Sequence, residues 1–384
     1  MKTFLGLLMV SVMIIGLPKV NYAQGEAAVP FLLLAPDSRA GGIGESGTGL
    51  ADNSAAIFWN PAGIAFLTGT ELSITHSNWL PQFNLDLFYD YLTYRSYFES
   101  LNGSVTASIT YMNFGEFIRT SEISPDPIGT FRSFDAALTL GYATKINNDW
   151  GLGFNFRLIH SRLSDQAVGE EQGTGVATSV SFDVAAMWRP ETLNIFGAEF
   201  GNRFSIGANL SNLGPKIAYI DQDQADPIPT NFRLGFALQI VNDEFNSLIY
   251  TVDFSKLLVS RDSSGHSDDF YKAIFTAWGD QTFGEEMRDI VTTMGLEYWY
   301  GTPGDFLFAL RTGFFYEDPS FGNRKFLTFG AGLRYDIYGF DFSYITTSVF
   351  KGGENHPLND TLRFTVLIGW GAVPETVRGL PRGI

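Results

Sequence analysis

The feature that most constrains this chain is a strict alternation of large apolar residues with small or polar ones. In residues 151–160, GLGFNFRLIH, leucine and phenylalanine fill one set of alternate positions, while glycine, asparagine and arginine fill most of the other. Residues 231–240 and 361–370 repeat the pattern. Successive side chains of a β-strand point to opposite faces, so each segment predicts a strand with one apolar face and one small or polar face.

A soluble sandwich also alternates, but three features favour a membrane-spanning barrel. The segments are roughly 9–14 residues long, which suits a tilted strand that crosses a bilayer. Their apolar faces are rich in phenylalanine, whereas the opposite faces carry glycine, alanine, serine, aspartate and arginine. Aromatic residues recur at segment ends, where a membrane barrel has its interfacial girdles. These residues are Trp188, Tyr298, Trp299, Tyr300, Tyr335 and Trp370.

Fourteen such segments lie between residues 71 and 370, and bacterial outer-membrane barrels have an even number of strands. We therefore predict an all-β fold, a 14-stranded antiparallel transmembrane β-barrel. Short turns belong on its periplasmic side and long loops outside. The short turns are 146–149, 242–246, 301–305 and 337–339, and the long loops include 114–130, 163–174, 214–229, 259–291 and 348–359. The connections 81–85 and 189–202 break the alternation of lengths.

Composition and charge exclude several classes of function. The chain has no cysteine, which rules out disulfides and thiolate metal sites. Its net charge of −16 argues against nucleic acid as a partner. Much of the excess acid lies in the long loops, so we expect an acidic outer rim. No catalytic motif is present, and the four histidines, His76, His160, His266 and His356, lack metal-ligand spacing. We expect no enzymatic activity, metal or cofactor.

The first 23 residues have the features of a signal peptide. Lys2 provides the positive charge, Phe4–Leu17 is an apolar run, and cleavage is expected after Ala23. No later stretch approaches 18 apolar residues. We therefore expect an exported protein of the cell outer membrane, surrounded by its lipid. The barrel would occupy residues 71–370, and residues 371–384 would form a tail.

Residues 24–70 are rich in glycine and precede the first predicted strand. Gly42–Gly47, GIGESG, matches the dinucleotide fingerprint G-x-G-x-x-G, which requires a buried strand directly before it. Here PDSRA intervenes, so we predict instead a hatch inside the lumen, where small residues fit against the wall. Asp37 and Arg39 would be buried there and ion-paired. The candidate partners are Arg157, Arg233, Arg334, Arg363, Asp135, Asp183 and Asp253.

Two motifs in the hatch segment carry a resemblance to a known family. Asp37-Ser38-Arg39-Ala40-Gly41-Gly42, followed by Trp59-Asn60-Pro61-Ala62-Gly63, resembles the PorV/PorQ family of the type IX secretion system, with PFLLLAPDSRAGGIGE closest to PorV. This family is a branch of the FadL-like fourteen-stranded barrels. The WNPAG element is shared with FadL-type transporters more widely, so it indicates only the superfamily. The tail after Trp370 is a departure, since such barrels often end on the aromatic residue of the last strand.

The resemblance implies a role in protein secretion. The protein would bind cargo through the cargo's carboxy-terminal signal domain as it leaves the type IX translocon. It would then deliver the cargo to a surface sortase. The alternative is a FadL-like channel for hydrophobic small molecules, which would need an apolar pocket beneath the loops and a lateral gate.

The long loop 259–291 contains a predicted helix. Phe270, Ile274 and Trp278 stand at i, i+4 and i+8, and Ser267 or Asp268 is placed to cap the helix. One interpretation is a helix that caps the barrel mouth, and the other is a docking surface for a protein partner.

Overall fold

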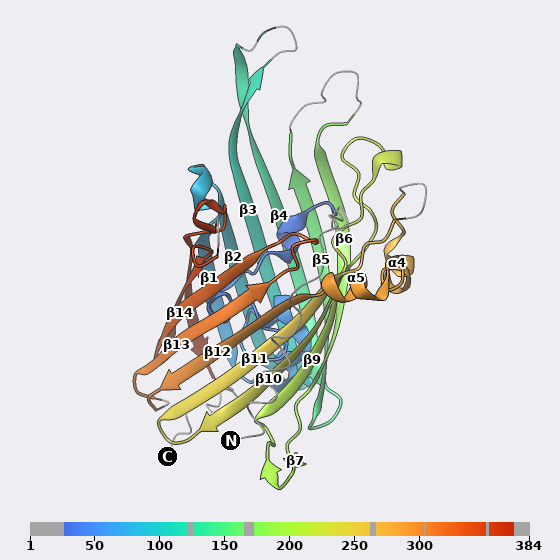
Figure 1. Ribbon diagram of the computed structural model, residues 1–384. Coiled ribbons are helices and arrows are strands. Elements are labelled where there is room, and N and C mark those ends of the chain that lie inside the picture. The colour runs from blue at the N-terminus through green and yellow to red at the C-terminus, as the bar shows by residue number, and fades with distance from the viewer. Residues whose placement is uncertain are drawn as a thin grey trace.

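In the computed structural model the chain forms a closed antiparallel barrel of fourteen strands, which confirms the predicted fold class (Figure 1). The structure describes residues 27–371, apart from 121–123, 125, 165–172, 262–265, 303 and 351–352. The predicted signal peptide and residues 372–384 of the predicted tail therefore lie outside the described residues. In the described part of the chain, no helix is both long and apolar enough to cross a membrane.

The barrel strands lie close to the predicted segments, and β1 pairs with β16 to close the wall. Their bounds are β1 Thr70–Asn78, β2 Phe88–Phe98, β3 Gly103–Thr120, β4 Pro127–Lys145, β5 Trp150–Arg162, β6 Val176–Trp188, β9 Phe204–Leu213, β10 Asn231–Asn242, β11 Asn246–Leu257, β12 Val291–Tyr300, β13 Leu307–Tyr316, β14 Lys325–Tyr335, β15 Tyr338–Thr346 and β16 Thr361–Trp370. The helices are η1 Pro30–Leu33, α2 Ser38–Gly42, α3 Ala56–Trp59, η2 Pro61–Phe66, η3 Pro81–Phe83, η4 Glu99–Leu101, η5 Gln222–Gln224, α4 Phe270–Thr276, α5 Phe283–Arg288 and η6 Gly353–Asn355.

The two faces of the strands follow the sequence alternation. On β5, Phe154 and Phe156 are exposed on the outer face, whereas Asn155 and Arg157 are buried in the lumen. One girdle assignment is wrong: Trp299 points into the lumen and is buried. The ring stacks under the guanidinium groups of Arg311 and Arg334, whose Cζ atoms each lie 5.2 Å from its centroid. Cation–π attraction thus holds an aromatic residue on the polar face.

The predicted loop 114–130 is mostly strand. β3 and β4 continue past the wall and pair only with each other, from Glu116↔Arg132 to Thr120↔Pro127. Their neighbours stop earlier, because β2 begins opposite Asn113 and β5 ends opposite Phe134. We call residues 116–132 the β3–β4 arm, and Figure 1 shows it rising above the other strands.

The remaining connections keep their sides even where their lengths depart from the prediction. Residues 189–203 lie on the short-turn side and contain a small hairpin, β7 Asn194–Ile195 and β8 Ala198–Glu199, at the lower edge of Figure 1 beside the β7 label. Residues 79–87 lie on the loop side. An antiparallel barrel fixes the side of each connection but not its length, so two exceptions in length do not disturb the topology.

Residues 27–69, which we call the hatch, lie inside the barrel as the blue segments of Figure 1. Inward-facing strand glycines approach the hatch backbone directly. A Cβ atom at Gly313 would lie 2.0 Å from the Gly44 nitrogen, and one at Gly207 would lie 2.2 Å from the Thr48 oxygen. Such distances leave room for hydrogen only, which explains the glycines of the polar face. The strand glycines concerned are Gly151, Gly153, Gly207, Gly235, Gly295, Gly313 and Gly330.

Candidate functional site: the hatch and its contacts with the wall

The short helix α2 is held in place at its first residues. Asp37 is its N-cap and accepts a hydrogen bond from the Ala40 N–H at 2.9 Å. Its second carboxylate oxygen accepts from the Trp59 indole N–H at 2.7 Å. Ser38 donates its backbone N–H to the Thr365 hydroxyl of β16 at 3.1 Å. The capping residue therefore joins the two motif segments of the hatch, and Ser38 fastens them to the wall.

Arg39 forms the central contact between hatch and wall. Its Nε and Nη2 atoms bind the two carboxylate oxygens of Glu297 on β12 at 2.8 and 2.7 Å. Its Nη1 binds Asp52 of the hatch at 2.5 Å. All three side chains are nearly fully buried. The bidentate geometry matches the planar guanidinium to the carboxylate, which suits arginine and not lysine.

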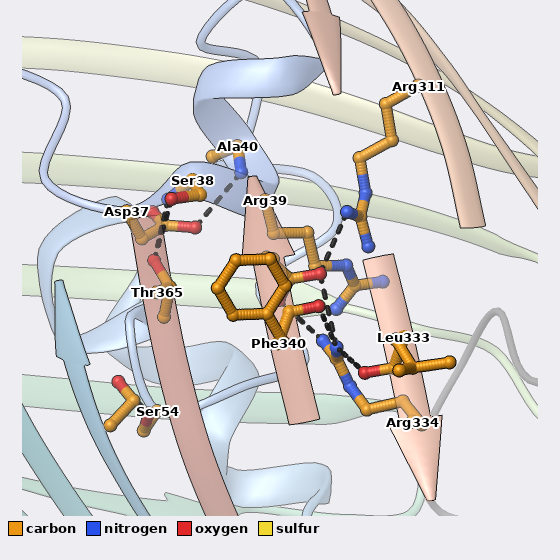
Figure 2. A network of polar contacts seen from close by, with 12 residues as sticks. Asp37, Ser38, Arg39, Ala40, Ser54, Arg311, Leu333, Arg334, Phe340 and Thr365 are labelled. Carbon is orange, nitrogen blue, oxygen red and sulfur yellow. Dashed lines mark hydrogen bonds and ion pairs between the residues drawn. The ribbon is translucent and has the colours of Figure 1, made fainter. Parts of the chain in front are cut away.

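The ion pairs continue across the wall. Arg311 of β13 binds Glu297 at 2.8 Å and Asp341 of β15 at 2.8 Å, and Asp341 also binds Arg334 of β14 at 2.6 Å. Figure 2 shows Arg39, Arg311 and Arg334 converging beside α2. We call the set the lumen ion network. In order, its members are Asp52, Arg39, Glu297, Arg311, Asp341 and Arg334. Three carboxylates alternate with three guanidiniums, so the buried network carries no net charge.

Burial and neighbouring charges shift the pKa values of Asp37, Asp52 and Arg39 in the hatch. Desolvation raises the pKa of Asp37, against the opposing hydrogen bonds from the Ala40 amide and the Trp59 indole. Burial also raises the pKa of Asp52, against the attraction of Arg39. For Arg39 burial lowers the pKa, but Asp52 and Glu297 together raise it well above its usual range. Arg39 thus stays charged and provides the positive centre around which the acids are arranged.

The predicted burial of Asp37 and Arg39 is confirmed, but their expected partners are wrong. Asp37 accepts from N–H groups, and Arg39 binds Asp52 and Glu297, neither of them a candidate. Among the candidates, Arg157 pairs with Asp183, and Arg363 pairs with Glu45 of the hatch at 2.9 Å. The alternation along β12 could have indicated Glu297, because it lies two residues from Gly295 and therefore on the same lumen-facing side of the strand.

Trp59, Asn60 and Pro61 form the second fastening of the hatch. Asn60 caps η2 by accepting from the Ala62 N–H at 3.0 Å, and it donates to the Ala186 carbonyl of β6 at 3.2 Å. Pro61 follows at the first position of η2, where a missing N–H costs nothing. Gly153 of β5 lies so close to Pro61 that a Cβ would meet its carbonyl carbon at 2.4 Å.

Two glycines of the apparent dinucleotide fingerprint, Gly42 and Gly44, contact the wall, whereas Gly47 packs on Trp59 of the hatch. Gly42 faces Gly330 of β14, where an added Cβ would lie 3.1 Å from its Cα. Gly44 has a positive φ of 75°, and a Cβ there would lie 2.5 Å from the Met294 carbonyl oxygen. Gly41 lies against Arg363 and Ser343. The motif begins at the last residue of α2, so a helix and not a buried strand leads into it.

A chamber that is open to solvent at its mouth lies between the hatch and the loop-side strand ends. Trp79, Phe315, Phe326 and Ile345 form much of its apolar wall. Four charged residues also line it, namely Glu45, Arg233, Asp253 and Arg324.

The predicted helix in loop 259–291 exists but is shorter than expected. α4 ends at Thr276, so Trp278 lies beyond it. Phe270 and Ile274 are half-buried, and Asp269 rather than Ser267 or Asp268 occupies the N-cap position. A second helix, α5, follows with a capping box of Thr282 and Glu285. The docking role of Phe270, Ile274 and Trp278 stays a prediction.

Among the residues that the structure describes, no cluster of three or more histidine, aspartate or glutamate side chains is arranged to hold a metal ion. The expected absence of a metal, a cofactor and an enzymatic activity stays a prediction.

A closed barrel with an apolar outer face and a charged, plugged lumen is an integral outer-membrane protein. The chain belongs to the PorV family of type IX secretion proteins, because the family described as "Type IX secretion system protein PorV" matches residues 20–264. This confirms the resemblance inferred from the hatch motifs. No curated protein sequence matches the chain.

The chain also matches solved structures, at low sequence identity. A Pseudomonas aeruginosa FadL homologue is 12% identical, with 87% of this chain and 97% of that chain covered and a TM-score of 0.47. The Pseudomonas putida toluene transporter TodX is 11% identical, with 92% of this chain and 98% of that chain covered and a TM-score of 0.47.

Proposed function

We propose that this type IX secretion protein binds cargo proteins as they leave the translocon and delivers them to the surface attachment complex with its sortase. Membership of the PorV family supports the place in the secretion system. The observation that carries the finer step is the hatch, which is fastened to the wall through the lumen ion network. A barrel plugged in this way is suited to presenting its outer surface to partners rather than to conducting solutes.

The energetics favour a hatch that stays in place. Withdrawal of Arg39 would leave Glu297 with one partner in a buried setting, and uncompensated buried charges are strongly destabilising. The close glycine contacts add shape complementarity along β12, β13 and β14. We infer that cargo is recognised outside the lumen, on the loop side, where the β3–β4 arm projects.

The chamber above the hatch favours a second candidate function. Its apolar wall of Trp79, Phe315 and Phe326 would accept a hydrophobic small molecule from the loop side. A channel would also need a route past the hatch or through the wall. The charged residues of the lining and the fixed hatch therefore make transport the weaker candidate.

Affinity purification from native outer membranes separates the two functions. A tagged full-length protein is extracted in mild detergent, with an unrelated tagged outer-membrane barrel as the control. Enrichment of translocon and of proteins bearing the type IX signal, relative to that control, supports cargo delivery. Enrichment of a hydrophobic small molecule without either protein class would contradict it and support transport.

Deletion of the gene tests whether cargo delivery to the cell surface depends on this protein. Loss of the protein should leave signal-bearing cargo in the periplasm and remove it from the cell surface. Restoration of surface display by the wild-type chain is the control. Normal display in the deletion strain would show that delivery does not depend on this protein.

A further inference from the structure

The connection between β11 and β12 is fixed against the outer face of the wall. Phe232 and Lys256 are paired neighbours on the outward face of β10 and β11, near their loop-side ends. The Trp278 ring packs on both: its centroid lies 6.0 Å from that of Phe232 and 5.8 Å from the Lys256 Nζ. In Figure 1, α4 correspondingly lies beside the upper ends of the strands, outside their outline.

A buried ion cluster holds the connection there. Lys256 binds Glu286 of α5 at 2.8 Å and also pairs with Asp289 just after it. Lys256 is only 3% exposed although it lies on the outward face of the barrel. A charge on that face would otherwise be costly beside lipid. The connection that carries α4 and α5 thus covers the loop-side end of β11, where Lys256 interrupts the apolar outer face.

The side of the helices that faces away from the wall is apolar. Tyr271 and Phe275 are 62% and 78% exposed and stand one turn apart on α4. Phe283 is 82% exposed, and Met287 follows it one turn later on α5. In water this much exposed aromatic surface would be unfavourable.

The position of the helices indicates what covers this face. Phe254 lies two residues before Lys256 on the same outward face of β11, which places it about 7 Å nearer the membrane centre along the strand. It is exposed and belongs to the lipid-facing band. Interfacial helices bury their apolar face roughly 5–10 Å into the boundary between headgroups and acyl chains. The helices therefore begin where the lipid-facing wall ends.

We propose that α4 and α5 form an interfacial anchor, with Tyr271, Phe275, Phe283 and Met287 inserted into the outer leaflet of the membrane. The occupant of the apolar face is lipid, because the face continues the lipid-facing surface of β10 and β11 through Trp278 and Phe232. The anchor places the Lys256 cluster at the membrane boundary. This inference does not depend on the proposed role in cargo delivery.

Lipid quenching of single labels tests the anchor. The natural chain has no cysteine, so one introduced thiol carries the only label. Phe275→Cys and Phe283→Cys report on the helices. Phe156→Cys, on the outer face of β5, is the lipid-exposed reference, and Phe196→Cys, fully exposed on the short-turn side, is the water-exposed reference. Each full-length protein carries an environment-sensitive fluorophore and is reconstituted into phosphatidylcholine vesicles, with or without brominated acyl chains.

We expect brominated lipid to quench labels at 275 and 283 to an extent comparable with 156, and aqueous iodide to quench them far less than 196. Heat-modifiable gel migration confirms that each variant is folded. Labels at 275 and 283 that respond like 196 to both quenchers would overturn the proposal. That result would leave the aromatic face in water and available to a protein partner.

Discussion

At the scale of single residues, the buried charges of the lumen act as one set. Each interior member of the lumen ion network contacts two opposite charges, as Glu297 does with Arg39 and Arg311. The set includes both hatch and wall, so its integrity determines whether the hatch stays seated. A change at one member therefore affects hatch and barrel together.

Glu297→Gln should destabilise the folded protein by about 3–5 kcal/mol, because it leaves an excess buried positive charge between Arg39 and Arg311. Urea unfolding in detergent micelles, followed by gel mobility, measures the loss. Glu244→Gln makes the same chemical change on an exposed turn and is the matched control. Equal midpoints for the two variants would show that the network contributes little.

Gly313→Ala should unseat the hatch, because the added Cβ would lie 2.0 Å from the Gly44 nitrogen and 2.2 Å from the Ile43 carbonyl carbon. Both contacts are with backbone, which has no rotamer to adopt instead. Limited proteolysis should then cleave the hatch faster than in the wild type. Gly369→Ala is the control, since its nearest atom would be 3.7 Å away. Unchanged protection of the hatch would contradict the packing argument.

Sequence alone predicts the face on which each of these residues lies, but not its partner. The two-residue alternation of strand faces places Arg157 and Asp183 in the lumen, and both are buried there. It does not connect Arg39 with Glu297, which is 258 residues away, because that contact depends on where the hatch settles. Trp299 shows a further limit, since hydrophobicity placed it at the membrane interface whereas stacking on arginine holds it inside.

At the scale of elements, the strands and their order were predictable because the alternation is long and regular. The ends of elements were not. β3 and β4 run on to Thr120 and back from Pro127, since they continue to pair with each other after their neighbours have stopped. α4 ends before Trp278, which binds the wall instead of extending the helix. In both cases tertiary or cross-strand contacts decided where the element ends.

Replacing the β3–β4 arm, residues 116–132, with an Asn-Gly turn should leave the barrel folded. The arm pairs only with itself, whereas the wall pairings of Asn113 and Phe134 remain. We expect unchanged urea stability and heat-modifiable migration. The comparison is a shorter deletion within the wall, residues 151–157, which removes pairings on both sides of β5 and should prevent assembly. Failure of the arm deletion to assemble would show that the arm guides folding.

At the scale of the whole molecule, the barrel and the hatch form one closed body. The hatch bonds to β12 through Arg39, to β16 through Ser38 and to β6 through Asn60, so its contacts are spread around the wall. A barrel of this size without a plug would enclose water. The hatch therefore determines whether the lumen is a pore.

Deletion of residues 36–63 should turn the closed barrel into an ion-conducting one. The change removes Arg39 and Asp52 and leaves the wall charges Glu297, Arg311 and Asp341 facing an open lumen. Planar-bilayer recordings should show steady conductance for the deletion and none for the wild type. Outer-membrane location and heat-modifiable migration of the deletion protein provide the control for folding. Similar conductance in both proteins would mean that the hatch does not close the lumen.

Ser38 and Thr365 are in contact although 327 residues separate them in the sequence. This separation bears on when the contact can form during assembly. The hatch leaves the ribosome and enters the periplasm first, yet its partners on β12 to β16 arrive last. Until then α2 and Arg39 have no permanent partners, although the apolar residues of the hatch can already pack on β2 to β6. Long-range contacts of this kind form slowly. A chain halted before β12 would hold a partly seated hatch beside an unclosed sheet, which is a state prone to aggregation. We therefore expect the seating of α2 and the closure of β1 on β16 to be coupled late steps, because both need β16.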